Sequence, residues 1–256
     1  MKAVILVGGF GTRLSEETIL LPKPMVPIGG KPILWHIMKI YSHYGINDFV
    51  LCLGYKSEAI KEYFRNYRMS GVDVTINTMT GEEIYHNNNK EDWRVTMVET
   101  GLNTMTGGRL RRIAPYVADG PFCMTYGDGV ADVNITALLD AHKASGLDAT
   151  VTAVHQPSRY GTLLLDGTNV KTIREKASED GIWINGGFFV LNPNAINHLT
   201  SDEDVWEKQG MEGLTKSKNL SVYRHDGFWQ SMDNIREKDV LEKLWMSNQA
   251  PWKVWD

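Results

Sequence analysis

The sequence predicts an α/β fold: an open, mixed but mostly parallel sheet flanked by helices, joined to a smaller portion rich in strands. Two observations support this prediction. Apolar, strand-like runs alternate with helix-like patterns through the first 150 residues, and such alternation is typical of a parallel sheet with helices on both faces. From Ala149 onward, short strand-like runs follow one another with turns between them.

The chain before residue 70 is expected to contain two strands and two helices. Ala3–Val7 and Phe49–Leu53 are compact apolar runs, as buried strands are. Pro32–Tyr44 is predicted as a helix because its apolar residues recur on one face. Glu58–Tyr67 is predicted as a second helix that begins after Ser57, a residue type that often caps helix N-termini.

Three further strands and one helix are predicted before residue 150. The runs Val72–Ile76, Val95–Val98 and Phe122–Tyr126 have the composition of strands. Ile135–Ala144 has the apolar periodicity of a helix. The polar stretch Gly81–Trp93 is interpreted as a loop, a lid or a subunit contact.

The rest of the chain is predicted to form four strands and a peripheral helix. The dipeptide Asp166-Gly167 is typical of a tight hairpin turn, and the charged stretch Asp202–Lys218 is expected to be helical. The strands are predicted over Ala149–Val154, Gly161–Leu165, Val170–Glu175 and Gly187–Leu191.

The C-terminal region is rich in tryptophan. Indole side chains near a chain end indicate a packing or subunit contact, and a tail folded on its own domain is the equal alternative. The residues are Trp229, Trp245, Trp252 and Trp255.

Composition and length exclude several classes of protein. A chain of 256 residues without a linker or repeat is expected to form one domain. Its net charge of -4 argues against a nucleic-acid partner. No apolar run has the length of a membrane span, and no signal peptide precedes the first strand. Cys52 and Cys123 lie in apolar runs, which indicates buried thiols of a cytoplasmic protein rather than a disulfide.

A glycine-rich loop follows the first strand and is the most informative feature of the chain. Gly8, Gly9 and Gly11 allow backbone N–H groups to approach a ligand closely, and an anion is the natural guest. Arg13 within the loop and Lys23 after it add full positive charge. The pattern fits a nucleoside triphosphate or a sugar phosphate. The alternative is a plain glycine turn with two surface cations.

Two common phosphate-binding motifs are absent from this loop. A Walker loop ends in Gly-Lys-Ser/Thr, which does not occur here. A dinucleotide fingerprint needs glycine at its sixth position, which is Leu14 when counted from Gly9. A nicotinamide oxidoreductase is therefore disfavoured.

Seven histidines are present, but their spacing does not fit a zinc site.

Together with other motifs, the loop resembles the signature of the sugar-phosphate nucleotidylyltransferases. These enzymes join a nucleoside triphosphate to a sugar 1-phosphate and release pyrophosphate. The resemblance extends along the whole chain. It is carried by Gly8-Gly9-Phe10-Gly11-Thr12-Arg13-Leu14, Ser15-Glu16-Glu17-Thr18, Pro22-Lys23-Pro24-Met25, Gly29-Gly30-Lys31-Pro32, Met105-Thr106-Gly107-Gly108-Arg109, Tyr126-Gly127-Asp128-Gly129, Ile184-Asn185-Gly186-Gly187 and Gly227-Phe228-Trp229-Gln230.

The resemblance implies a Rossmann-like fold, with residues 1–150 mainly binding nucleotide and residues 151–256 mainly binding sugar. It implies CTP and glucose 1-phosphate as substrates, CDP-glucose and pyrophosphate as products, and Mg²⁺ as cofactor. Such products lead to bacterial surface polysaccharides, including lipopolysaccharide O-antigen. It also implies a homo-oligomer, a trimer or a hexamer. A TTP- or UTP-specific enzyme is the nearest alternative, and a catalytically inactive regulatory homologue is a second one.

Residue roles are also carried over from the resemblance. Asp128 and Asp233 match the family's metal-binding aspartates, and Arg13, Lys23 and Asp128 are expected to be catalytic. Direct in-line attack is expected, because no motif for a covalent nucleophile is present. The sugar-phosphate site is expected to contain Lys23, Glu175, Lys176 and a turn at Asn185 and Gly186. The nucleotide site is expected to contain Leu6, Gly8, Gly9, Phe10, Gly11, Thr12, Arg13, Thr104, Arg109 and Gly127.

Overall fold

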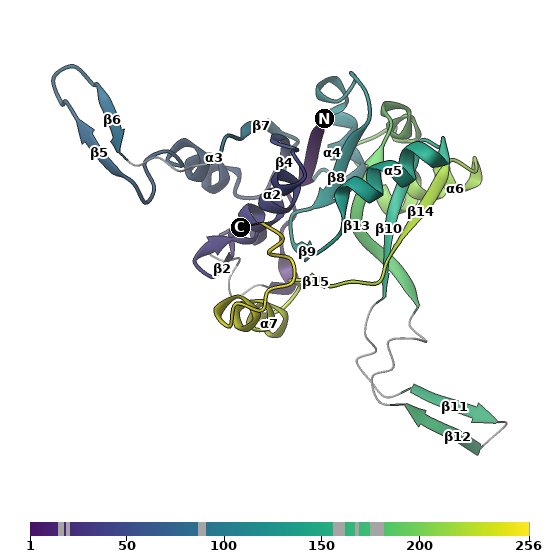
Figure 1. Cartoon of the computed structure of the whole chain (residues 1–256). Coiled ribbons are helices and arrows are strands. Elements are labelled where there is room, and N and C mark those ends of the chain that lie inside the picture. The colour runs from purple at the N-terminus through teal and green to yellow at the C-terminus, as the bar shows by residue number, and fades with distance from the viewer. Residues whose placement is uncertain are drawn as a thin grey trace.

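A seven-stranded sheet forms the centre of the protein, with strand order β14-β10-β13-β8-β1-β4-β7 (Figure 1). The computed structural model describes residues 1–14, 18, 21–86, 91–155, 162–166, 169–174 and 182–255. For Arg13, and for the described residues between 162 and 174, it describes the backbone only. The strands of the sheet are β1 (Lys2–Leu6), β4 (Asp48–Leu53), β7 (Arg94–Glu99), β8 (Phe122–Tyr126), β10 (Ala149–His155), β13 (Trp183–Leu191) and β14 (Leu220–His225).

The sheet is mixed and mostly parallel, as the sequence predicts. β1 pairs in parallel with both β4 and β8, β4 with β7, and β10 with β14. Only β13 runs antiparallel to its neighbours β8 and β10. The parallel pairs place the C-terminal ends of β1, β4 and β8 at one edge of the sheet, where ligands bind in folds of this kind.

Helices cover both faces of the sheet, and β1 shows why. Ala3 and Ile5 point into one apolar cluster, which also contains side chains of α2, α5 and α7. Val4 and Leu6 point into a second cluster, which contains side chains of α4 and α6. The helices are α2 (Ile33–His43), α3 (Ser57–Arg65), α4 (Thr106–Arg112), α5 (Ile135–Ser145), α6 (Met211–Lys216) and α7 (Ile235–Met246).

Short elements connect the longer helices and strands. Most are single turns of 3-10 helix or two- to three-residue strands. They are η1 (Thr12–Leu14), η2 (Lys23–Met25), β2 (Pro27–Ile28), β3 (Lys31–Pro32), η3 (Ala114–Tyr116), β9 (Gly129–Ala131), η5 (Pro193–His198), β15 (Trp229–Ser231) and the π-helical turn η6 (Trp206–Gly210).

The start of α3 differs from its prediction. Ser57 is the first residue of α3 and not its N-cap, which is Lys56. Lys56 has the left-handed conformation, with a φ of 50°, and its side chain makes no capping hydrogen bond. The left-handed residue turns the chain sharply into the helix, a backbone feature that residue type alone did not reveal.

Two hairpins stand apart from the central sheet (Figure 1). The first pairs β5 (Asp73–Ile76) with β6 (Glu83–His86). The loop expected over 81–93 is therefore wrong for residues 83–86, which form a strand, and residues 87–90 lie outside the described residues. The second pairs β11 (Thr162–Asp166) with β12 (Asn169–Arg174), on either side of the predicted turn. Strand-like patterning thus predicted β5, β11 and β12, but not β6 and not the separation of the two hairpins from the main sheet.

The C-terminal tail folds back on its own domain, one of the two alternatives for its tryptophans. Trp245, Trp252 and Trp255 surround His36 of α2, with ring centroids 4.6, 6.2 and 6.2 Å from its imidazole. His36 and Trp252 are fully buried. Burial lowers the pKa of His36 to about 4, although its hydrogen bond to the Ile28 carbonyl acts in the opposite direction.

Other expectations about buried groups are confirmed. Cys52 and Cys123 are free, buried thiols. Burial raises the pKa of each thiol to about 12, which makes both unreactive near neutral pH.

None of the helices that the structure describes combines the length and the apolar character needed to cross a bilayer.

Candidate active site

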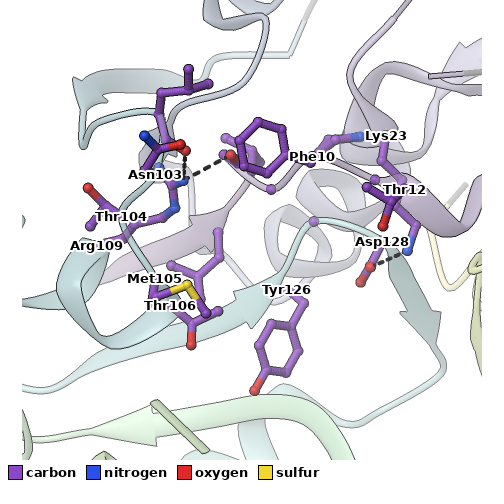
Figure 2. A pocket seen from close by; sticks show the side chains of 18 residues that line it. Phe10, Thr12, Lys23, Asn103, Thr104, Met105, Thr106, Arg109, Tyr126 and Asp128 are labelled. Carbon is purple, nitrogen blue, oxygen red and sulfur yellow. Dashed lines mark hydrogen bonds and ion pairs between the residues drawn. The ribbon is translucent and has the colours of Figure 1, made fainter. Parts of the chain in front are cut away.

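The predicted phosphate loop and the Tyr126-Gly127-Asp128 motif meet at adjacent strand ends. Leu6 of β1 lies opposite Tyr126 of β8 in register, and the Gly127 amide donates to the Leu6 carbonyl at 3.0 Å. A cavity of about 380 Å³ opens at this point (Figure 2). Its lining residues are Leu6–Thr12, Lys23, Pro24, Leu102–Thr106, Arg109 and Tyr126–Asp128.

A lysine joins two aspartates at the rim of this cavity. Lys23 Nζ lies 2.6 Å from Asp128 Oδ2 and 2.6 Å from Asp233 Oδ1. The lysine side chain is 9% exposed, whereas the carboxylates are 30% and 23% exposed. Burial alone lowers the pKa of Lys23, but the charges of Asp128 and Asp233 and their hydrogen bonds raise it above its ordinary value. The ammonium is therefore charged at neutral pH.

Secondary structure brings these two distant aspartates together. β9 after Asp128 pairs with β15 before Asp233, with Gly129 opposite Ser231. The Met232 amide also donates to the Asp128 carbonyl at 2.8 Å. The N-cap of α7 is Asn234, whose side chain accepts from Glu237 N. The Asp233 carboxylate is thus not needed as a helix cap and faces Lys23.

The carboxylate pair fits a divalent cation. Both carboxylates lie within hydrogen-bonding distance of one ammonium, which offsets one of their two charges and leaves the other for a second cation. Hard oxygen donors of this kind suit Mg²⁺, which often takes one or two carboxylates plus substrate phosphates. Among the residues that the structure describes, no three His, Cys, Asp or Glu side chains form a complete cage. The donor set therefore matches an ion shared with a phosphate ligand.

Arg109 holds the glycine-rich loop through a hydrogen bond to its backbone. Its guanidinium is 4% exposed and donates to the carbonyls of Gly8 at 2.9 Å and Leu53 at 2.8 Å. It also bonds to Thr100 Oγ1 and to the Gly101 carbonyl. A Cβ atom on Gly8 would lie 2.3 Å from Arg109 Nη1, so glycine is required for the close approach. Arg109 lines the cavity, but most of its donors hold protein carbonyls, and its contact with nucleotide remains a prediction.

The segment 102–106 forms a cavity wall that sequence reasoning mostly missed. Within this segment only Thr104, which is buried, was expected in the nucleotide site. Leu102, Asn103, Met105 and Thr106 line the same wall, yet Leu102 and Met105 are unusually exposed apolar side chains. The only signal in the sequence was two apolar residues, Leu102 and Met105, in a polar stretch that leads into the Gly107-Gly108 pair.

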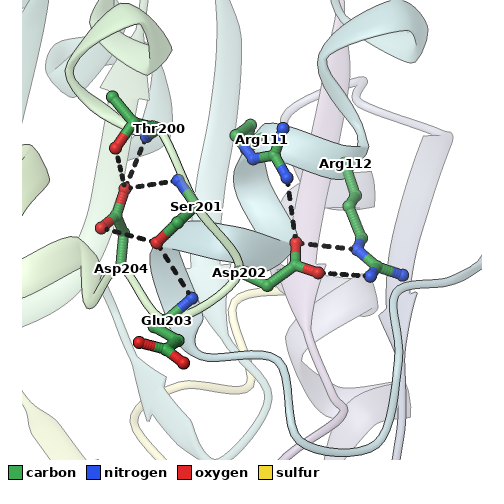
Figure 3. Close-up of polar contacts among 7 residues, drawn as sticks. All are labelled: Arg111, Arg112, Thr200, Ser201, Asp202, Glu203 and Asp204. Carbon is green, nitrogen blue, oxygen red and sulfur yellow. Dashed lines mark hydrogen bonds and ion pairs between the residues drawn. The ribbon is translucent and has the colours of Figure 1, made fainter.

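A second loop holds this wall in place (Figure 3). Asp202 pairs with Arg111 at 3.2 Å and with Arg112 at 2.5 Å, and its carbonyl accepts from the Met105 amide at 2.8 Å. A Cβ atom on Gly108 would lie 2.5 Å from the Asp202 carbonyl oxygen. The glycines of the motif therefore allow the loop to contact the first turn of α4.

The expected sugar-binding turn at Asn185 and Gly186 is wrong as a turn. Both residues lie within the strand β13, whose pairing with β10 shifts register near this point. The adjacent Gly187 has a φ of +85°, and a Cβ atom there would lie 2.8 Å from the Tyr126 ring. The glycine pair thus marks an irregular strand that makes room for Tyr126. Asn185 Nδ2 reaches the Tyr126 hydroxyl at 3.3 Å.

Three predicted site residues are described only in part or not at all. Arg13 has its backbone in η1, beside the cavity residue Thr12, and its side chain lies outside the description. Glu175 and Lys176 lie outside the described residues, directly after Arg174, the last residue of β12. Their roles remain predictions.

Comparison with known proteins gives concordant matches. A family model described as nucleotidyl transferase matches residues 2–233. The glucose-1-phosphate cytidylyltransferases of Salmonella typhi and Salmonella typhimurium are each 53% identical to this chain, and each match covers all of both chains. The UTP-bound UGPase structure from Acinetobacter baumannii covers 95% of this chain and 92% of its own, with a TM-score of 0.67 and 15% identity. That structural likeness supports the fold alone.

Proposed function

This chain belongs to the nucleotidyl transferase family, and from that premise we propose that it joins CTP to α-D-glucose 1-phosphate, giving CDP-glucose and pyrophosphate. The full-length similarity to glucose-1-phosphate cytidylyltransferases supports these substrates and a place in sugar-nucleotide biosynthesis. The observation that carries the proposal is the contact of Lys23 with Asp128 and Asp233, beside the glycine-rich loop.

In the proposed reaction, a phosphate oxygen of glucose 1-phosphate attacks the α-phosphorus of CTP, and pyrophosphate leaves. Both partners are anionic, so the main task of the site is to align them and to offset their charge. Lys23 supplies a fixed, charged ammonium at the rim of the cavity. The backbone between Leu6 and Gly11 lines the cavity and is proposed to contact the nucleotide, and Arg13 is proposed to bind its β- and γ-phosphates.

Asp128 and Asp233 would hold Mg²⁺. Held by these carboxylates, such an ion would supply positive charge to offset that of the phosphates. The protein contributes the position of the two carboxylates, which is fixed by the pairing of β9 with β15. Thr104, Arg109 and Gly127 are proposed to complete the nucleotide site.

We also propose that Glu175, Lys176, Asn185 and Gly186 contact the sugar phosphate, together with Lys23. In this proposal residues 1–150 of the single domain mainly bind nucleotide, and residues 151–256 mainly bind sugar. The enzyme is proposed to assemble as a homo-trimer or homo-hexamer and to work in the cytoplasm, where its free thiols would stay reduced.

Initial rates with glucose 1-phosphate and each of CTP, TTP, UTP and GTP test the substrate assignment, with the sugar nucleotide identified by mass spectrometry. We expect CTP to be used at least roughly tenfold faster than the other triphosphates, as is common where a site bonds specifically to polar groups. A TTP or UTP rate equal to the CTP rate would replace the cytidylyl assignment. A folded protein that forms no product with any triphosphate would indicate an inactive homologue.

Asp128→Asn tests the carboxylate pair in the same assay. We expect turnover to fall on the order of 100-fold or more, because one fixed charge of the metal site is lost. The matched control is Asp119→Asn, since the Asp119 side chain is 94% exposed and distant from the cavity residues. Wild-type turnover in Asp128→Asn would show that the metal is held elsewhere.

A further inference from the structure

Glu207 links the nucleotide wall to the proposed sugar side of the site. Its carboxylate accepts a hydrogen bond from the Thr106 hydroxyl at 2.9 Å, and Thr106 lines the cavity. The other carboxylate oxygen accepts from the Tyr126 hydroxyl. Tyr126 in turn accepts from Asn185 Nδ2 at 3.3 Å. Four side chains from distant segments thus form one hydrogen-bonded chain across the site.

The charge of Glu207 determines the direction of these hydrogen bonds. An ionised carboxylate can only accept, so the single Tyr126 proton is directed towards Glu207. The Tyr126 oxygen then offers only lone pairs to Asn185, whose amide must present its NH₂ group. The Asn185 carbonyl oxygen is left for the Gly187 amide, which donates to it at 2.9 Å. Both ends of the Asn185 amide are therefore oriented.

Glu207 itself lies in an unusual and tightly held segment. It belongs to the π-helical turn η6, and such turns are frequent at functional sites. Its neighbour Trp206 is fully buried, and the Trp206 amide donates to Thr106 Oγ1 at 2.9 Å. A Cβ atom on Gly210 would lie 2.2 Å from the Trp206 ring. The turn is thus packed around one indole, which fixes the carboxylate beside it.

Tyr126 lies close to the reacting groups, so a change in its position would alter the site. It lines the cavity and ends β8, two residues before Asp128. In Figure 2 its ring extends from the strand end towards the same side of the cavity as Thr106. The positive φ of Gly187 gives this ring its space. The hydroxyl therefore joins the cavity wall to the irregular part of β13.

We propose that Glu207 is a positioning residue for glucose 1-phosphate: it fixes the Tyr126 hydroxyl and, through it, the Asn185 amide that contacts the sugar. This inference rests on the proposed function. Glu207 acts through Tyr126 and takes no part in the charge balance at the phosphates. Replacing Glu207 therefore weakens the binding of glucose 1-phosphate more than it changes nucleotide binding or turnover.

Steady-state kinetics of Glu207→Gln, Tyr126→Phe and the double variant test this role. Glutamine can turn its NH₂ group towards Tyr126 and so no longer fixes the direction of the bond. We expect each single variant to raise the KM for glucose 1-phosphate roughly tenfold, with the KM for CTP and kcat changed less than about threefold. The double variant should resemble Tyr126→Phe, because both changes break the same chain of hydrogen bonds.

Glu212→Gln is the matched control, since the Glu212 side chain is 62% exposed on the next helix and pairs only with Lys216 among the described residues. Its kinetic constants should equal those of the wild type. A merely structural role of Glu207 would change both KM values and kcat together, and would overturn the inference. So would an unchanged sugar KM in Glu207→Gln and Tyr126→Phe.

Calorimetric titration with glucose 1-phosphate separates this inference from the proposed function. Wild-type protein that binds the sugar phosphate but forms no CDP-glucose would overturn the proposed function alone. The variants would then be compared by their affinity for glucose 1-phosphate, with the same roughly tenfold weakening expected. Equal affinity of wild type and variants would overturn the inference while leaving the proposed reaction intact.

Discussion

At the scale of single residues, Lys23 shows how context gives a common side chain a specific role. A surface lysine that pairs with carboxylates contributes little to the stability of the fold, because water screens the charges. Lys23 is nearly buried, and its two aspartate partners come from segments more than 100 residues away. Its ammonium therefore both balances the acidic pair and offers charge to a phosphate ligand.

Lys23→Gln should cut turnover on the order of 100-fold, because a preorganised charge is lost at the reacting centre. Without metal it should also lower the free energy of unfolding by about 1–3 kcal/mol, less than for a fully buried pair because the carboxylates are partly exposed. Mg²⁺ should restore part of that stability. Urea unfolding with and without Mg²⁺ measures the change.

Lys61→Gln provides the matched control, because Lys61 also pairs with two carboxylates, Glu58 at 2.9 Å and Glu99 at 2.5 Å, but at the surface. Its activity should be that of the wild type. Equal losses in the two variants would argue against a special role for the buried ammonium.

A second effect at residue scale concerns the buried His36. Its Nε2 donates to the Ile28 carbonyl, and its Nδ1 accepts from the Trp252 indole at 3.4 Å. A proton on Nδ1 would remove that acceptor, and burial disfavours the charged ring. The pKa is lowered from 6.5 to about 4, so between these values the unfolded chain binds a proton that the folded chain does not.

Stability should therefore fall as the pH falls from 6.5 towards 4, by about 3 kcal/mol in total from this group. His36→Gln keeps an N–H donor and an acceptor but does not titrate. The difference in the free energy of unfolding between wild type and variant, measured in urea from pH 4.5 to 7, should shrink as the pH falls. A difference that stays constant across this range would contradict the prediction.

At the scale of elements, α4 connects the cavity wall to the rest of the fold. Its first turn contacts the Asp202–Asp204 loop through backbone atoms, and its last turn supplies two arginines to Asp202. Asp204 in turn accepts from the backbone amides of Thr200 and Ser201 (Figure 3). The position of the helix thus depends on close backbone contact rather than on side-chain burial alone.

Gly108→Ala should destabilise the protein by about 1–3 kcal/mol. An alanine Cβ would lie 2.5 Å from the Asp202 carbonyl oxygen, and backbone on both sides cannot yield easily. This cost exceeds the gain of about 1 kcal/mol that alanine brings to a helix interior. The midpoint of urea unfolding should fall at constant slope. A raised midpoint would show that the loop moves away freely.

At the scale of the whole molecule, the site joins segments from across the chain. The cavity combines residues 6–12, 23–24, 102–106, 109 and 126–128, and Asp233 joins through Lys23. A ligand that binds all these segments would stabilise the complete fold rather than one part of it, because unfolding of any segment destroys the site.

CTP with Mg²⁺, at about 100 times its dissociation constant, should therefore stabilise the protein by about 2.7 kcal/mol. For a chain of this size the gain amounts to roughly 5–10 °C in Tm. Differential scanning fluorimetry with CTP and Mg²⁺, and with CTP and a chelator, separates the metal-dependent part. Asp128→Asn should lose that part, and a shift of the same size with and without metal would argue against a carboxylate-held ion.

Much of the fold was predictable because local patterns set it. Apolar runs gave β1, β4 and β8 within one or two residues, and helical periodicity gave α2 and α5. The glycine loop was correctly expected directly after the first strand. Backbone details were missed at Lys56 and at Gly187, because a left-handed residue or a shift in strand register leaves no strong pattern in the sequence.

By itself the sequence determined the types of element and the chemistry available to them: a glycine loop, nearby cations and aspartates that suit a phosphate ligand. Only the tertiary structure decided which of these side chains meet. The pairing of β9 with β15 brings Asp233 to Lys23, and the π-helical turn brings Glu207 to Tyr126. The physical reason is that periodicity and turn chemistry act over a few residues, whereas such contacts depend on strand order and on packing between segments some 80 to 210 residues apart.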